Sequence, residues 1–212
     1  MNVFSEQGRS PLFSALERGN WSAVQLMLDR PHKPASLTAP IVSQPVNQLL
    51  PLTVAIMWGN SHLVEGLVRR GAMVDARDCY GSTALHSAAL KGDIGCFDLL
   101  LELGASLAGQ TAQGRKLLHI LAERGATEML RLCALHRPTE LRQAINEPCT
   151  HEPSGAYALH AAVQFGSATA VRVLLELGAD SSRCCGQHHT PSEMAAALGR
   201  THLARLIDGW AP

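Results

Sequence analysis

Cysteine and histidine side chains form the part of this sequence closest to a chemically reactive cluster. The stretch from Cys184 to His189 contains residue types that bind zinc, but two adjacent ligand pairs strain tetrahedral coordination. We therefore expect no metal and no cofactor. A metal- or redox-responsive switch stays as the alternative function, and it predicts a melting temperature that changes with chelator or oxidant. Its candidate ligands are Cys149, His151, Cys184, Cys185 and His188.

Three other histidines, His86, His119 and His160, recur at one position of a repeated pattern, which favours a structural role over a catalytic one. The sequence contains no glycine-rich phosphate loop, no nucleophile elbow and no convincing pair of carboxylates. We predict that the chain is not an enzyme and has no catalytic residues.

The pattern itself starts at residues 10, 50, 83, 116, 157 and 190. A small or apolar residue follows each start after five positions, and a glycine follows after nine. Such a glycine suits the end of a helix, where a left-handed backbone is needed, and alanine lets two helices approach closely. Each unit therefore predicts a pair of antiparallel helices. The six glycines are Gly19, Gly59, Gly92, Gly125, Gly166 and Gly199.

Two units carry the pattern most completely, with Thr83-Ala84-Leu85-His86 and Leu159-His160-Ala161-Ala162 at their starts and Gly104-Ala105 and Gly178-Ala179 at their ends. They resemble the ankyrin-repeat family, and the resemblance covers about residues 5–208. It implies an all-α fold, a solenoid of six stacked helix-pair repeats with projecting β-hairpin or loop tips, which also implies that the recurring histidines bond backbone groups between repeats. We expect one domain over 1–212, with repeats at about 5–31, 46–74, 78–107, 111–138, 152–180 and 185–210.

Insertions at about 32–45 and 138–151 interrupt the regular spacing. The first contains several prolines, and we expect it to be an irregular loop. At the last hairpin, His188 takes the place where four other repeats have glycine, which indicates a strained or altered turn.

Composition limits the class of partner. The chain has 18 basic and 18 acidic residues, so it lacks the positive field that sequence-independent nucleic-acid binding requires. The start of the chain shows no signal peptide, and no apolar run is long enough for a membrane span. Six cysteines do not form a secreted-type framework. We expect a monomer in the cytoplasm, with the nucleus or a host cytosol as alternatives, that binds another protein.

The family resemblance also implies a binding surface. In ankyrin repeats, variable residues of the hairpin tips and those four, seven and eight positions after each start face a concave groove. Large apolar side chains at such sites are typical of binding hot spots. Alternatively, the proline-rich insertion covers Trp58 and Met57. The expected partner-binding residues, centred on repeats 2–4, are Trp58, Met57, Tyr80, Leu90, Lys91, Arg77, Arg115, Arg124 and Phe165.

We therefore expect a protein-binding module that acts as inhibitor, adaptor or scaffold. The sequence is weakly similar to IκB-type inhibitors of transcription factors, and a secreted microbial effector would show the same pattern. A ubiquitin-ligase adaptor is disfavoured, because no sequence follows the last repeat to recruit a ligase.

Overall fold

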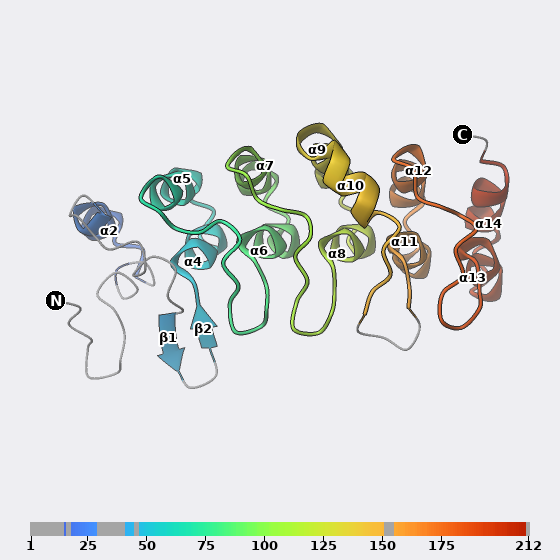
Figure 1. The fold of residues 1–212 in the computed structure, drawn as a ribbon, viewed down its shortest axis with the longest axis horizontal. Coiled ribbons are helices and arrows are strands. Elements are labelled where there is room, and N and C mark those ends of the chain that lie inside the picture. Colours follow the sequence, from blue (N-terminus) through green and yellow to red (C-terminus); the bar gives the residue numbers. More distant parts are fainter. Residues whose placement is uncertain (1–14, 16–17, 29–40, 45–46, 151–154, 211–212) are drawn as a thin grey trace. The chain divides into compact units, whose positions relative to one another are not determined.

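The computed structural model describes residues 15, 18–28, 41–44, 47–150 and 155–210. It divides the chain into two compact units, residues 1–105 and 106–212, and each is described by itself. Within each unit the helices follow one another in antiparallel pairs (Figure 1). The described helices thus match the helix-pair repeats that the sequence predicts.

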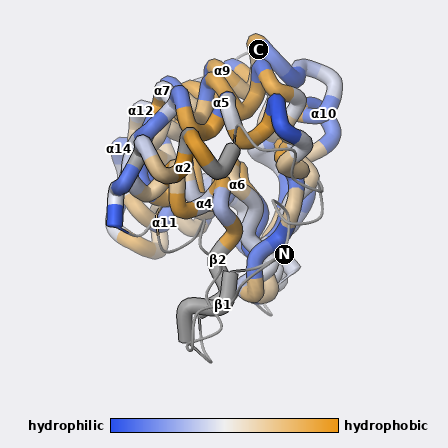
Figure 2. Tube along the Cα trace, turned by 90° about the vertical axis from the view of Figure 1, so that its left-hand side faces the viewer, coloured by the Kyte–Doolittle hydropathy of each residue, from blue (hydrophilic) through white to orange (hydrophobic). Residues whose placement is uncertain are grey.

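The described part of the first unit contains two complete helix pairs, α4 with α5 and α6 with α7, and the single helix α2 before them. Helix α4 packs against α6, and α5 packs against α7, so successive pairs lie side by side. The trace of α4 is mostly hydrophobic (Figure 2). The helices are α2 (Trp21–Leu28), α4 (Pro51–Met57), α5 (Ser61–Arg69), α6 (Ala84–Lys91) and α7 (Ile94–Glu102).

The proline-rich insertion corrects one expectation. Its described part holds an antiparallel hairpin of strands β1 (Ile41–Gln44) and β2 (Asn47–Leu49), where an irregular loop was expected. Ile41 pairs with Leu49 at its open end, and a register shift follows Val42. Alternating backbone hydrogen bonds between two short segments are enough to order them, although the prolines between residues 31 and 40 lie outside the described residues.

The second unit repeats the same arrangement. Helix α11 packs against α8 and α13, and α12 packs against α9 and α14. The helices are α8 (Leu117–Glu123), α9 (Thr127–His136), α10 (Pro138–Ala144), α11 (Ala158–Phe165), α12 (Ala168–Glu176), α13 (Pro191–Ala197) and α14 (Thr201–Asp208). No described helix is long and apolar enough to cross a membrane.

Glycines end the first helix of each repeat as the sequence predicts. Gly59, Gly92 and Gly166 have φ values of 69°, 77° and 78°, in the left-handed region that favours glycine. The small residues four positions before these glycines are fully buried between the helices of a pair, as at Ala55 and Ala162. His188 is the one non-glycine residue with positive φ among the described residues, at 62°. This value is close to the 69° of Gly81 and 70° of Gly114, so the turn is strained and keeps the backbone of the other hairpins.

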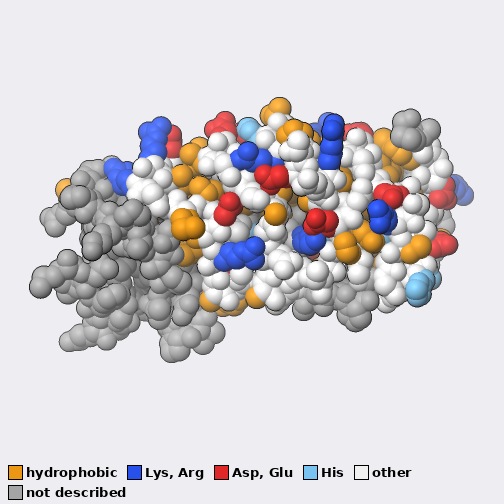
Figure 3. Space-filling model, in the orientation of Figure 1, with side chains coloured by type: hydrophobic (Ala, Val, Ile, Leu, Met, Phe, Trp, Pro, Cys, Tyr) orange, Lys and Arg blue, Asp and Glu red, His pale blue; other side chains and the backbone are white. Residues whose placement is uncertain are grey.

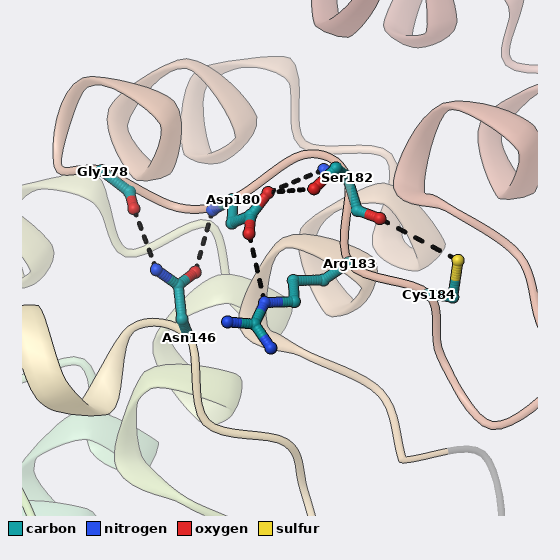
Figure 4. Close-up of polar contacts among 6 residues, drawn as sticks. All are labelled: Asn146, Gly178, Asp180, Ser182, Arg183 and Cys184. Atoms are coloured by element: carbon teal, nitrogen blue, oxygen red, sulfur yellow. Dashed lines mark hydrogen bonds and ion pairs between the residues drawn. The ribbon is translucent and has the colours of Figure 1, made fainter.

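The second insertion forms a helix and a polar link. Proline at the first position of α10 suits a helix start, because its missing N–H is not needed there. Glu140 of α10 accepts hydrogen bonds from Ser106 Oγ (3.0 Å) and Leu107 N (2.9 Å). Asn146, beyond α10, donates to Gly178 O (3.1 Å) and accepts from Asp180 N (2.8 Å; Figure 4). The insertion therefore ties the start of this unit to the end of α12.

Candidate functional site

Helix α4 ends in two exposed apolar side chains. Met57 is its last residue and Trp58 caps it, with 61% and 54% of their surfaces exposed. Ile56, immediately before them, is fully buried. The helix thus uses its body for packing and presents its last turn to solvent, so the described structure leaves Met57 and Trp58 uncovered.

Helix α6 ends in the same way, and a lysine joins it to α4. Leu90 is 45% exposed, and the next residue, Lys91, donates from Nζ to Ile56 O at 2.8 Å. That bond places the end of α6 beside the end of α4. Met57, Trp58 and Leu90 therefore belong to one exposed region, which we call the α4–α6 surface.

The positive charge of Lys91 is balanced within the fold. Its Nζ lies 3.1 Å from Asp93 Oδ2, while Asp93 Oδ1 caps α7 by accepting from Cys96 N at 3.0 Å. Burial by itself would raise the pKa of Asp93, but the hydrogen bonds from Cys96 and Lys91 outweigh it and hold that pKa below its usual value. Lys91, expected to contact a partner, is thus first a structural link between repeats.

Tyr80 lies on the hairpin before α6. Asp78 Oδ1 accepts from Tyr80 N (2.9 Å) and Ser82 N (2.8 Å), which shapes the turn and leaves the tyrosine 48% exposed. Tyr80 precedes α6 and Leu90 lies near its end, so a helix about 12 Å long separates the two residues. Arg77, before the same turn, is exposed.

Residues four positions after each start were expected to face the groove, and this prediction is wrong for three of them. Val54, Ile120 and Ala161 are buried. They lie one turn before the exposed helix ends on the same helix face, where neighbouring first helices pack together. Only the last turn of each first helix extends beyond that packing.

The second unit places charged and apolar side chains at the equivalent helix ends. Arg124 caps α8 and is exposed, Phe165 ends α11 with 58% of its surface exposed, and Leu198 caps α13 with 50% exposed. Arg115 is paired with Glu123, so its charge is balanced inside the unit. On the face drawn in Figure 3, the basic and acidic side chains of the described residues lie interspersed.

The recurring histidines bond backbone groups of the following repeat, as the resemblance implies. His119 Nε2 donates to Ala156 O at 2.8 Å, and His160 Nε2 donates to His189 O at 3.0 Å. Burial lowers the pKa of both rings, and their carbonyl contacts offset this only in part. These buried neutral rings stabilise the packing of repeats.

His86 adds a local role. Its Nδ1 lies 2.9 Å from the Thr83 hydroxyl and accepts from Thr83 N at 3.4 Å, which completes a capping box at the start of α6. In the next two repeats, the position of Thr83 is taken by Lys116 and Tyr157, which provide no side-chain cap.

The cysteine and histidine candidates are not assembled into a metal site in the described part of the chain, where no group of three potential ligands converges. Cys149 Sγ lies 3.3 Å from Gly114 O, and Cys185 is buried. Cys184 is exposed and its sulfur points toward Ser182 O (3.9 Å; Figure 4). His151 lies outside the described residues.

Two further cysteines are packed in the second helices, as the sequence predicts. Cys96 and Cys133 are buried, and burial raises the pKa of their thiols to about 11 and about 12. Both therefore remain protonated near neutral pH and act as small apolar residues.

Sequence reasoning missed Arg200 as a candidate. Its guanidinium donates to Val163 O at the end of α11, beside Phe165. The available signal was an arginine at the position that starts the second helix, where Asn20, Asn60 and Asp93 stand in other repeats.

Sequence and structure comparisons agree with this architecture. The family model for Ankyrin repeats (3 copies) matches residues 23–111, and that for a single Ankyrin repeat matches residues 154–185. The crystal structure of EF0377, an ankyrin repeat protein, superposes with a TM-score of 0.79 at 20% identity, over 94% of this chain and 97% of that one. At this identity the likeness concerns the fold alone.

Curated relatives share the repeats at low identity. The Nuclear factor NF-kappa-B p105 subunit of Gallus gallus is 29% identical over 74% of this chain and 16% of its own length. Ankyrin repeat and SOCS box protein 16 of Homo sapiens is 29% identical over 79% of this chain and 44% of its own length. This chain thus spans less than half of either relative. The matches to both family models and the helix-pair repeats show that the chain belongs to the ankyrin-repeat family.

Proposed function

We propose that this chain is a protein-binding module, acting as inhibitor, adaptor or scaffold, that holds a partner protein on the concave side expected of its repeats. The observation that carries the proposal is the α4–α6 surface. Three large apolar side chains, Met57, Trp58 and Leu90, are exposed at equivalent ends of neighbouring helices. Burying their exposed apolar surface against a partner is favourable.

The balance of charges supports an apolar contact there. Lys91 is paired with Asp93 and bonded to Ile56 O, so a partner need not supply an opposite charge. A tryptophan surrounded by apolar neighbours is typical of residues whose truncation costs about 2 kcal/mol or more of binding free energy. Trp58 is therefore the proposed anchor, with Leu90 and Met57 beside it.

The family supports protein binding without naming a partner. Ankyrin repeats, whose family models match this chain, generally mediate protein–protein interaction. Six unpaired cysteines fit a reducing compartment, and we place the chain in the cytoplasm on that ground.

The test is capture of partners from lysate with the full chain, identification by mass spectrometry and titration of the purified partner. Trp58→Ala/Leu90→Ala should weaken binding by about 100-fold, because two anchors are lost. Leu135→Ala is the matched control, since Leu135 is 73% exposed on the second helix α9. Unchanged affinity for the double variant, with native circular dichroism, would refute the proposed surface.

A further inference from the structure

Arg200 departs from the local rule of its position. The residue that precedes the second helix caps it in three repeats, where Asn60, Asp93 and Ser167 accept from a backbone N–H at 3.0, 3.0 and 3.2 Å. Ala126 before α9 provides no cap either, but Arg200 places a long cationic side chain there. An arginine cannot accept a hydrogen bond, and α14 accordingly begins without a side-chain cap. Residues that contradict local preference without a local gain are candidates for function.

The side chain of Arg200 reaches back to the preceding repeat. Its Nη1 donates to Val163 O, and its Cζ lies 3.2 Å from where a Cβ of Gly166 would stand. The guanidinium is thereby held at the end of α11, where Phe165 is exposed. In the first unit, Lys91 makes the equivalent bond: its Nζ donates to the carbonyl of Ile56, which has the same repeat position as Val163.

The two cations differ in how their charge is balanced. Lys91 has Asp93 at 3.1 Å, whereas no carboxylate pairs with Arg200 among the residues that the structure describes. At the end of α8, which packs against α11, Arg124 likewise has no described carboxylate partner, since Glu123 is paired with Arg115. We call Arg124, Phe165, Leu198 and Arg200 the α8–α13 surface.

We infer that the α8–α13 surface is a second anchoring site, which takes a partner segment carrying a carboxylate next to a large apolar side chain. The inference rests on the proposed protein-binding function and adds the chemistry of the bound segment. Phe165 and Leu198 offer apolar contact. Arg200 uses one N–H on Val163, and its remaining donors can hold a carboxylate in bidentate geometry.

The charge complementarity is specific to this surface. Neither Arg124 nor Arg200 forms an ion pair with a carboxylate of the described residues, so each can attract an acidic side chain. The neighbouring helices carry further exposed basic groups, among them Arg172 on α12 and His202 and Arg205 on α14. Contacts of this kind favour acidic segments and weaken as salt increases.

The experiment selects short peptides from a random library on the immobilised full-length chain. Selected sequences should be enriched in Asp or Glu within two positions of Leu, Ile, Phe or Trp. Binding of the best peptide is then measured by fluorescence anisotropy. Phe165→Ala and Arg200→Gln should each reduce affinity by about tenfold or more. Arg205→Gln, an exposed arginine on the same helix, is the matched control and should stay within about twofold.

A charge reversal keeps the test independent of lost stability. Arg200→Glu should change the selection itself, so that Lys and Arg replace Asp and Glu in the enriched peptides. Amide signals of Gly166 and Gly199 should shift when the wild-type chain binds its peptide in solution. Circular dichroism of every variant shows whether the fold is retained.

Several results would overturn the inference. The selection could yield no enriched peptide, or peptides without an acidic preference. The affinity of Arg200→Gln could be unchanged. An oligonucleotide of equal charge could displace the peptide, which would indicate that the surface binds any polyanion. Trp58→Ala separates the two proposals. If it abolishes peptide binding while Arg200→Gln preserves it, protein binding stands and the second anchoring site does not.

Discussion

The ends of the first helices carry differently balanced charges in the two units, although in both a cationic side chain bonds a carbonyl there. In the first unit, Lys91 bonds the carbonyl of Ile56 and is neutralised by Asp93, beside exposed Met57 and Trp58. In the second, Arg200 bonds the carbonyl of Val163 without a described carboxylate partner. A cation from the next repeat thus supports a helix end in both units, but of these two cations Lys91 has a carboxylate partner and Arg200 has none among the described residues. The same scaffold can therefore offer an apolar surface and a cationic one.

The largest expected effect concerns the glycines beneath those cations. A Cβ at Gly59 would lie 2.8 Å from Lys91 Nζ, whereas a Cβ at Gly92 meets nothing within 4 Å. Both positions have positive φ, so alanine costs about 1–2 kcal/mol of backbone strain at either. Gly59→Ala should cost about 1 kcal/mol more, because it displaces the Lys91 bond. Urea denaturation measures both free energies of unfolding, and equal losses would contradict the role of Lys91.

The corresponding pair in the second unit sharpens the comparison. A Cβ at Gly166 would stand 3.2 Å from Arg200, whereas one at Gly199 meets nothing within 4 Å. Gly166→Ala should destabilise more than Gly199→Ala, by a smaller margin than in the first unit, because the contact is looser. A margin larger than that of the first unit would show that Arg200 is the more important link.

A loss of stability at low pH is expected from His119 and His160. Their folded-state pKa values lie below the ordinary value of 6.5, so the unfolded chain binds protons first as the pH falls. Stability is fully present above pH 6.5 and is lost as the pH falls through and below that value. Denaturation at a series of pH values tests this, with His119→Gln/His160→Gln as control. A steeper loss in that control than in the wild type would contradict the assignment.

Salt dependence should separate the two surfaces. Between about 50 and 300 mM NaCl, binding at the α8–α13 surface should weaken severalfold, because Arg124 and Arg200 are unbalanced. Contact at the α4–α6 surface should change by less than about twofold, since Lys91 is already paired. Titrations of the selected peptide and of the captured partner provide the measurement, and equal salt dependence would remove the distinction.

The smallest effect is a gain of stability at a missing cap. Tyr157 replaces the threonine of the Thr83–His86 capping box, and the buried Nδ1 of His160 has no described partner. Tyr157→Thr should add up to about 1 kcal/mol, and Thr83→Val should remove a similar amount, both by thermal or urea denaturation. A loss on Tyr157→Thr would show that the contact of its ring with His160, at 5.7 Å between centroids, contributes more than the cap.

Much of the fold could be predicted because its signals are local. The positive φ at Gly59 and Gly92 follows from the lack of a side chain, and the strained turn at His188 was visible as a missing glycine. The exposure of Trp58 and Phe165 followed from their place in the last turn of a helix. The burial of Val54 did not, because it depends on how closely neighbouring first helices pack.

The candidate site was less predictable, because its contacts join residues that are not neighbours in the sequence. Lys91 and Arg115 were expected to contact a partner, but Lys91 bonds Ile56 of the preceding repeat and Arg115 pairs with Glu123 of its own repeat. No periodic pattern in the sequence predicted helix α10, nor that its Glu140 accepts hydrogen bonds from Ser106 and Leu107. Arg200 looked like an ordinary surface arginine.

The sequence by itself determined the repeat, the helix ends and the apolar residues that stand at them, since turn glycines and helix periodicity act over a few neighbouring positions. The tertiary structure decided which charges are balanced and which remain available. Lys91 reaches the carbonyl of Ile56 and Arg200 reaches that of Val163, because packing one repeat on the next sets the distances between groups far apart in the chain.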